Sequence, residues 1–330
     1  MVESKHQWKA WLYLAPAIIL LLVFTVWPII NTVSMAFQEG YDYSNIKKLE
    51  AYNEMNGTNL KLDMPIGLGN FKSVLAYEEF GTVLGNTMIL CVATVPISTV
   101  LALLIAVALN SIKPFQKVLQ TIYFLPYVTN SIAIGMVFYA MFNMIGLGPD
   151  GSVQEMTSVG IVNTVIRAFG GDPINWVNAG SEKLYNMIVL IVYIVWNALP
   201  FKILVLLGGL QSINKQYYEA ARVDGTSRSR ILTRITVPLL SPMIAYVVIT
   251  GFIGGFKEYS SVVGIFDVNM GPPAAQGRPL DTMVGYIYSA LEDVGNAAQG
   301  RASAAALILF GIILVVTLIN LQVSKKKVHY

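Results

Sequence analysis

Long apolar runs, separated by polar segments, dominate the hydrophobic pattern of this chain. A helix that crosses a bilayer needs about 20 mostly apolar residues. Six segments reach that length: residues 11–30, 83–109, 118–142, 184–210, 243–266 and 302–323. The first run continues through Pro28 and has no small-residue cleavage pattern at its end, so we interpret it as a spanning helix and not as a signal peptide. The pattern predicts an all-α integral membrane protein with six transmembrane helices.

Composition agrees with this interpretation. The 330 residues are 55% hydrophobic and 12% charged, whereas soluble domains carry about 25% charged residues. The net charge of +3 gives no reason to expect nucleic acid as a partner. The single cysteine, Cys91, excludes an intrachain disulfide and is expected to be a small packing residue. His6 and His329 lie near opposite ends of the chain, so they suggest no metal site.

The distribution of basic residues predicts the orientation in the membrane. With the N-terminus inside, twelve of the 22 Lys and Arg residues fall in inside segments and eight in outside segments. The outside segments are together about twice as long, so basic residues are denser inside, as cytoplasmic loops require. We therefore expect both termini in the cytoplasm. The two remaining lysines fall within spans, and Lys202 is expected to extend its ammonium toward the cytoplasmic interface.

A polar segment at residues 216–242 interrupts the apolar pattern on the cytoplasmic side. Its first part, "QYYEAARVD", is typical of a short helix, which Gly225 is expected to end. Thr226 or Ser227 can cap a second helix. Such a helix pair can dock into a groove on another protein, or it can be an amphipathic connector on the lipid headgroups. Spacing alone favours the connector.

The same segment carries a motif with defined spacing. Glu219-Ala220-Ala221 is followed after three residues by Gly225, and after nine more by "ITVP", which ends at Pro238. This resembles the cytoplasmic E-A-A signature of ABC importer permeases, with Val237 in place of the usual Leu. "LAPAIILLLVFTVWPIINTVSMAF" and "ALLIAVALNSIKPFQKVLQTIYFLPYV" also resemble the larger permease of maltose- and glycerol-phosphate-type carbohydrate importers. The resemblance covers nearly all of the chain.

The resemblance implies a type I ABC importer permease bundle in the bacterial cytoplasmic (inner) membrane. Residues 1–82 are expected to form a transmembrane helix and an extracytoplasmic loop. Residues 83–330 are expected to form a core permease domain of five transmembrane helices, with a coupling helix at about 216–238. Such a chain forms half of the translocation pathway for a sugar or oligosaccharide.

The resemblance also implies the partners. They are a second homologous permease subunit, two ATP-binding subunits, an extracytoplasmic solute-binding protein and the lipid bilayer. The chain has no G-x-x-x-x-G-K-[ST] phosphate loop. We therefore expect that this chain binds no cofactor, that it is a transport subunit and not an enzyme, and that a partner ATPase holds ATP and Mg.

Two sets of site residues follow from the resemblance. The coupling set inserts into a cleft of the ATPase: Glu219 pairs with a basic residue, the alanines allow close approach, and Gly225 makes the turn. Its members are Glu219, Ala220, Ala221, Arg222, Asp224 and Gly225. The substrate pathway is carried over from the maltose permease onto "LPYVTNS", "VWNALPF" and "GFIGGFKEY", as Tyr127, Asn130, Ser131, Trp196, Asn197, Phe201, Gly255, Lys257, Glu258 and Tyr259.

Several pathway positions have competing interpretations. Gly251 and Gly255 form G-x-x-x-G, which favours helix packing over substrate contact. Lys257 and Glu258 stand where the maltose permease has Asn, and adjacent helical positions point about 100° apart, so we expect only one of the two to face the pathway fully.

Two other classes of function remain open from the residues alone. An ion-driven secondary carrier for a polar solute needs titratable groups in the membrane, and Glu258 is the only acidic residue deep in a predicted span. A membrane-embedded enzyme needs a catalytic constellation, and no paired carboxylates or histidine cluster support one. The exact solute also stays open: an oligosaccharide is expected, while Lys257 allows a phosphorylated or acidic sugar.

Overall fold

The computed structural model describes residues 7–112, 116–144, 160–293 and 297–327. Within these ranges the regular elements are helices, with one isolated bridge between Gln38 and Ile66. The chain divides into two compact units, the first made of Met1–Phe80 with Tyr286–Phe310 and the second of Gly81–Gly285 with Gly311–Tyr330. The predicted domain division near residue 82 stays a prediction.

The described residues contain four helices that are long and apolar enough to cross a membrane. They are Trp8–Phe37, Phe80–Ser111, Lys183–Ser212 and Ala298–Lys325. They agree with the first, second, fourth and sixth spans that the sequence predicts. The protein is therefore an all-α integral membrane protein, as expected.

The third and fifth predicted spans are not single helices, which corrects the sequence prediction. The third consists of α6 (Gln116–Phe124), the 3-10 turn η2 (Leu125–Val128) and α7 (Ser131–Phe142). The fifth consists of α13 (Ser241–Gly255) and α14 (Ser260–Phe266), with residues 256–259 outside any helix. Pro126 lacks a backbone N–H and the pair Gly254-Gly255 is a weak helix former, so both segments break where propensity is low.

A further bend precedes α13. The segment Arg228–Leu239, made of α11 (Arg228–Ile231), η3 (Leu232–Thr236) and α12 (Val237–Leu239), meets Ser241–Gly255 at 70°. The structure therefore gives four spans, or five if this bent pair counts as one. It does not confirm the count of six.

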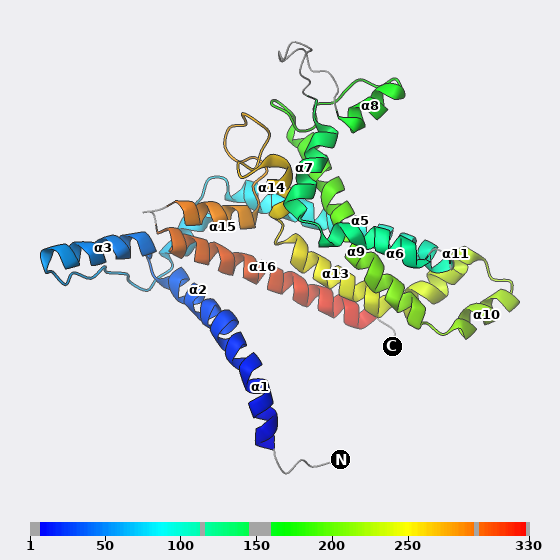
Figure 1. Cartoon of the computed structure of the whole chain (residues 1–330), viewed down its shortest axis with the longest axis horizontal. Coiled ribbons are helices and arrows are strands. Elements are labelled where there is room, and N and C mark those ends of the chain that lie inside the picture. Colours follow the sequence, from blue (N-terminus) through cyan, green and yellow to red (C-terminus); the bar gives the residue numbers. More distant parts are fainter. Residues whose placement is uncertain (1–6, 113–115, 145–159, 294–296, 328–330) are drawn as a thin grey trace. The chain divides into compact units, whose positions relative to one another are not determined.

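The first unit begins with a continuous apolar rod. The rod consists of α1 (Gln7–Leu21), the π-helical turn η1 (Leu22–Val26) and α2 (Trp27–Phe37), drawn in dark blue in Figure 1. Two polar helices follow it, α3 (Tyr43–Asn56) and α4 (Gly69–Leu75). The buried Asn70 ties α4 to the end of the rod, because its Nδ2 donates to the carbonyls of Ala36 (3.1 Å) and Gln38 (2.9 Å).

A segment from the far end of the sequence completes the first unit. It contains most of α15 (Met283–Glu292) and the beginning of α16 (Ala298–Lys327). The amide of Tyr43 donates to Gln299 Oε1 (2.9 Å), and the amide of Gly300 donates to the carbonyl of Tyr41 (3.2 Å). These bonds hold the start of α16 against the polar helices of the N-terminal region.

The second unit is organised around α9 (Lys183–Ser212). Apolar side chains of α9 pack against α5 (Phe80–Ser111) and α13 in one buried cluster that includes Ala106, Leu206 and Val247. A second cluster joins α9 to α7 and α14 and includes Phe138 and Tyr193. Figure 1 places α8 (Ile161–Ala168) at one end of α9 and α10 (Lys215–Val223) at the other. Helix α9 therefore contacts both broken spans.

Helices α7 and α14 approach each other through glycine. A Cβ atom added to Gly135 would lie 2.6 Å from the backbone carbonyl carbon of Gly264, which is closer than atoms pack. Because the obstacle is backbone, the neighbour cannot move aside without separating the helices.

We expect Gly135→Ala to destabilise the second unit by about 1–3 kcal/mol, the typical cost of overpacking a core. The expected result is a lower midpoint of thermal unfolding for the purified chain in detergent. Gly208→Ala is the matched control, because it lies inside α9 with nothing within 4 Å of the added Cβ. An unchanged midpoint for Gly135→Ala would contradict the close crossing of α7 and α14.

Candidate functional site

The break in the third predicted span is held by side chains on both sides. Asn130 caps α7, because its Oδ1 accepts from the amides of Ile132 (2.8 Å) and Ala133 (3.3 Å). From α9, the buried Tyr193 hydroxyl donates to the carbonyl of Ser131 (2.5 Å), and Asn197 Nδ2 donates to Ser131 Oγ (3.3 Å). Asn130 thus satisfies two of the amides that the start of a helix leaves free, and the two bonds from α9 hold Ser131 at the break.

The break between α13 and α14 has similar support. Glu258 Oε1 accepts from the amide of Ser261 (3.1 Å) at the start of α14, and Thr282 Oγ1 donates to the carbonyl of Glu258 (2.8 Å). Lys257, one residue earlier, is exposed. The neighbouring charges therefore point in different directions.

A cavity of about 290 Å³ lies between α5, α9, α13 and the break in the third span. Five of the predicted pathway residues line it: Tyr127, Asn197, Phe201, Gly255 and Glu258. Its lining also includes polar residues that the sequence analysis missed: Thr94, Ser98, Lys202 and Thr250. The rings of Tyr127 and Phe201 are stacked, with centroids 5.9 Å apart and planes 19° apart.

The other predicted pathway residues lie outside this lining. Trp196 packs against Phe138, with ring centroids 5.3 Å apart, and Tyr259 is partly buried against the same apolar cluster. Asn130 and Ser131 hold the break as described above. Lys257 is also absent from the lining, so of the charged pair only Glu258 reaches the cavity.

The position of Lys202 corrects a sequence prediction. Lys202 does not extend to the interface: it is only 5% exposed, and it lies in the middle part of α9. Its Nζ donates to Ser98 Oγ (2.7 Å), Thr99 Oγ1 (3.0 Å) and the Val95 carbonyl (3.2 Å) of α5. The only signal of this burial in the sequence is the pair of hydroxyl residues Ser98 and Thr99 in α5. It can be interpreted only when α5 and α9 are known to pack together.

The G-x-x-x-G prediction of helix packing is confirmed. A Cβ added to Gly255 would lie 2.8 Å from Cys91 Sγ, and one added to Gly251 would lie 3.1 Å from Val95 Cγ1. Both glycines therefore allow α13 to approach α5 closely. Cys91 is buried in this contact, as its apolar context predicted.

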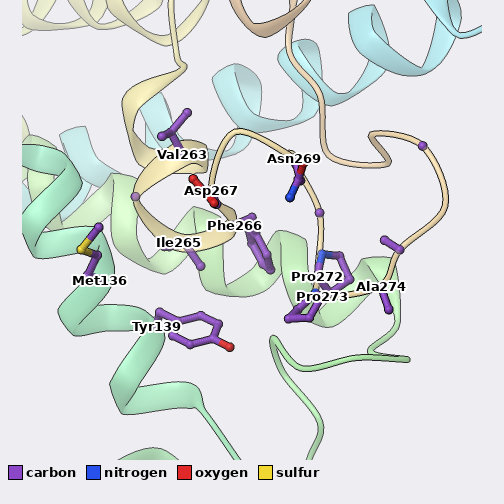
Figure 2. A pocket seen from close by; sticks show the side chains of 14 residues that line it. Met136, Tyr139, Val263, Ile265, Phe266, Asp267, Asn269, Pro272, Pro273 and Ala274 are labelled. Carbon is purple, nitrogen blue, oxygen red and sulfur yellow. The ribbon is translucent and has the colours of Figure 1, made fainter.

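A larger cavity, of about 620 Å³, lies elsewhere in the second unit, between α7, α14 and the loop that follows α14. Figure 2 shows Tyr139 on α7, Phe266 and Asp267 at the end of α14, and the Pro272–Pro273 pair of the loop. None of the predicted site residues lines it. The smaller cavity, which gathers half of the predicted pathway residues, is therefore the candidate solute site.

Helix α10 contains the Glu-Ala-Ala motif, and it ends at Gly225 as the sequence predicts. Asn214 caps the start, because its Oδ1 accepts from the amide of Gln216 (3.0 Å). At the end, Gly225 adopts φ +66°, its amide donates to the Arg222 carbonyl (3.1 Å), and the Thr226 amide donates to the Ala221 carbonyl (2.9 Å). This pair of bonds is the Schellman motif, which needs a left-handed residue.

One face of α10 is free and the other is held by the chain. Ala221 is buried, and the hydroxyls of Thr236 and Tyr218 lie 3.4 Å apart, which ties α10 to η3. Glu219, Ala220, Arg222 and Asp224 are exposed, together with the apolar side chains of Tyr217 and Val223. Most of the coupling set that the sequence predicts therefore lies on an accessible surface. The second helix of the segment, α11, starts directly after Ser227, as expected.

We expect Gly225→Ala to weaken the end of α10, because a left-handed conformation costs an L-residue about 1–2 kcal/mol. Hydrogen–deuterium exchange of the peptide that contains residues 215–227 should become faster. Gly225→Asn is the matched control, since Asn tolerates this conformation better than Ala. Equal exchange in Gly225→Ala and the unsubstituted chain would show that the turn does not depend on glycine.

Comparisons with known proteins agree with this geometry. Residues 95–329 match the family described as binding-protein-dependent transport system inner membrane component. The chain is 29% identical to the arabinooligosaccharides transport system permease protein AraP of Bacillus subtilis, over 95% of this chain and 88% of AraP. It is 26% identical to the sn-glycerol-3-phosphate transport system permease protein UgpA of Agrobacterium fabrum, over 97% of this chain and 96% of UgpA.

A solved structure shares the fold. One chain of a bacterial ABC transporter involved in the import of the acidic polysaccharide alginate superposes with a TM-score of 0.69 and 25% identity, over 98% of this chain and 96% of that one. A second solved structure, a bacterial alginate ABC transporter in complex with an alginate pentasaccharide-bound periplasmic protein, also superposes with a TM-score of 0.69 and 25% identity. Since the family match extends over more than half of its length, this chain belongs to the inner membrane components of binding-protein-dependent transport systems.

Proposed function

We propose that this ABC importer permease forms half of the translocation pathway for a sugar or oligosaccharide. The observation that carries the proposal is the meeting of Tyr127, Phe201 and Asn197 at a break in a membrane helix. Aromatic faces suit sugar rings, and amide groups suit hydroxyls. AraP and the alginate transporter support a carbohydrate, since their names refer to arabinooligosaccharides and alginate, whereas UgpA is named for sn-glycerol-3-phosphate.

Within this proposal the predicted pathway residues divide into two roles. Tyr127, Phe201, Asn197 and Glu258 contact the solute in the cavity, and Gly255 lets α13 approach α5 closely beside it. Four of the remaining members support the cavity walls: Asn130 and Ser131 hold the break, and Trp196 and Tyr259 pack behind it. The fifth, Lys257, is exposed outside the lining and has neither role. Discontinuous membrane helices around a polar site are the usual way in which transporters build a binding site.

Helix α10 is the proposed coupling helix. Its exposed Glu219 and Ala220 present a carboxylate and a small residue, which suit insertion into a basic cleft. Arg222 and Asp224 border the same end, and the Gly225 turn orients the helix. The ATP-binding partner holds ATP and Mg, and this chain binds no cofactor of its own.

The proposed assembly contains a second homologous permease, two ATP-binding subunits and an extracytoplasmic solute-binding protein. The complex of the alginate transporter with a periplasmic protein supports the last of these. The density of basic residues supports placing both termini in the cytoplasm of a bacterium. The relatives named above are subunits of transport systems, so they lend no support to the ion-driven carrier or to an enzyme.

The proposal predicts which proteins copurify with the full-length tagged chain in mild detergent from its native cells. Mass spectrometry should find an ATP-binding subunit and a second permease. Glu219→Lys should reduce the yield of the ATP-binding subunit by at least about tenfold, because a lost partner in a buried charge pair costs about 2–5 kcal/mol. Glu50→Lys is the control, since it changes an exposed carboxylate on the predicted outer side.

Two results would count against the proposal in different ways. If the unsubstituted chain purifies alone or only as a homo-oligomer, the importer function is wrong and a self-sufficient carrier takes its place. If Glu219→Lys retains the ATP-binding subunit at the level of Glu50→Lys, the importer remains but α10 is not its coupling helix.

A further inference from the structure

Lys202 places a cation inside the membrane bundle. Its side chain is 5% exposed and lines the candidate cavity. The ammonium donates to Ser98 Oγ (2.7 Å), Thr99 Oγ1 (3.0 Å) and the Val95 carbonyl (3.2 Å), which are all neutral oxygens of α5. These bonds satisfy its hydrogen-bond donors but leave its charge without a counter-ion.

No carboxylate supplies that counter-ion in the part of the chain that the structure describes. The ion pairs among these residues join Lys47 to Glu50, Arg278 to Asp281 and Arg301 to Asp293. Glu258 lines the same cavity, but its Oε1 accepts from the Ser261 amide and it forms no ion pair with Lys202. An uncompensated charge in a membrane bundle is costly and commonly marks a functional site.

Lys202 and Gly251 line the cavity together. A Cβ atom added to Gly251 would lie 3.3 Å from Lys202 Nζ, so the ammonium packs closely against α13 and a larger residue there would crowd it. On the α9 side, Phe201 directly precedes Lys202 and stacks with Tyr127. Both aromatics line the same cavity as Lys202, so a ring placed against them shares the cavity with the cation. Of the three bonds to α5, the one to Val95 is the longest and the easiest to exchange for a ligand oxygen.

We propose that Lys202 makes this cavity selective for a solute that carries an anionic group, a carboxylate or a phosphate, next to its sugar ring. The inference rests on the proposed function of the cavity as the solute site. It assigns charge recognition to Lys202 and not to Lys257, the exposed lysine that the sequence favoured. Lys202 is then a specificity-determining residue: it attracts the anionic solute and repels a cationic one.

The test compares pairs of probes in which one member carries an anionic group and the other is neutral. Saturation-transfer NMR titrations of the full-length chain, purified in detergent with its copurifying subunits, give the Kd of digalacturonate and of its dimethyl ester. A second pair, glucose phosphate and glucose, distinguishes a phosphate from a carboxylate. We expect the anionic member of one pair to bind at least about tenfold more tightly, as a charge-assisted hydrogen bond would provide.

The variants distinguish a role of Lys202 in solute recognition from a purely structural role. Lys202→Met keeps an unbranched side chain of similar length, and it should bring the ratio of the two Kd values close to one without weakening the neutral probe. Lys202→Arg should keep the preference, because it keeps the charge. Lys257→Met, which removes a lysine outside the lining, should leave the ratio unchanged.

Each other outcome overturns the inference. If the unsubstituted chain binds both members of each pair equally, Lys202 does not select anionic solutes. This result contradicts the inference even if a variant fails to fold. If Lys202→Met keeps the preference, or Lys257→Met removes it, the selection lies elsewhere. If the neutral probes bind and only the preference is missing, the carbohydrate function survives. If no probe binds, the carbohydrate part of the proposed function fails as well.

Discussion

The hydrogen bond from the Tyr193 hydroxyl to the Ser131 carbonyl is the contact on which the candidate site depends. The start of α7 is a helix end inside the bundle, where water is absent, so its polar groups need partners from the protein. Tyr193 is fully buried in α9 and binds the carbonyl of Ser131, the first residue of α7, so it fixes the distance between α9 and the start of α7. The polar cavity beside Asn197 and Phe201 exists because the break can be tolerated there.

The same constraint explains why α9 is the central element of the second unit. It supplies apolar side chains to both buried clusters, and it supplies Tyr193, Asn197 and Lys202 to polar groups on α7 and α5. Side-chain hydrogen bonds between membrane helices are individually modest, about 0.6–2 kcal/mol each. Their importance here is geometric, because they set which faces of α5, α9 and α13 meet around the cavity.

The features that the sequence predicted depend on local pattern, whereas those that it missed depend on contacts between segments far apart in the chain. Of the six spans predicted from apolar length, four agree with long helices, and the spacing of Glu219 and Gly225 predicted α10 and its end. Pro126 showed only that a helix is weak near that position, while the contact that holds the start of α7 against α9 comes from Tyr193, 62 residues after Ser131 in the sequence. Lys202 was misplaced for the same reason, since its burial depends on which face of α9 packs against α5.

We infer that the breaks beside α9 create an aqueous pathway and not a polar part of the packing core. Cysteine accessibility tests it directly, in a background that lacks the buried Cys91. Asn197→Cys and Thr250→Cys, in the cavity lining, should react with a hydrophilic maleimide, whereas Val192→Cys and Leu204→Cys, exposed apolar positions of α9 outside the lining, should not. Unreactive cysteines in the lining, or equal labelling of all four positions, would contradict the claim.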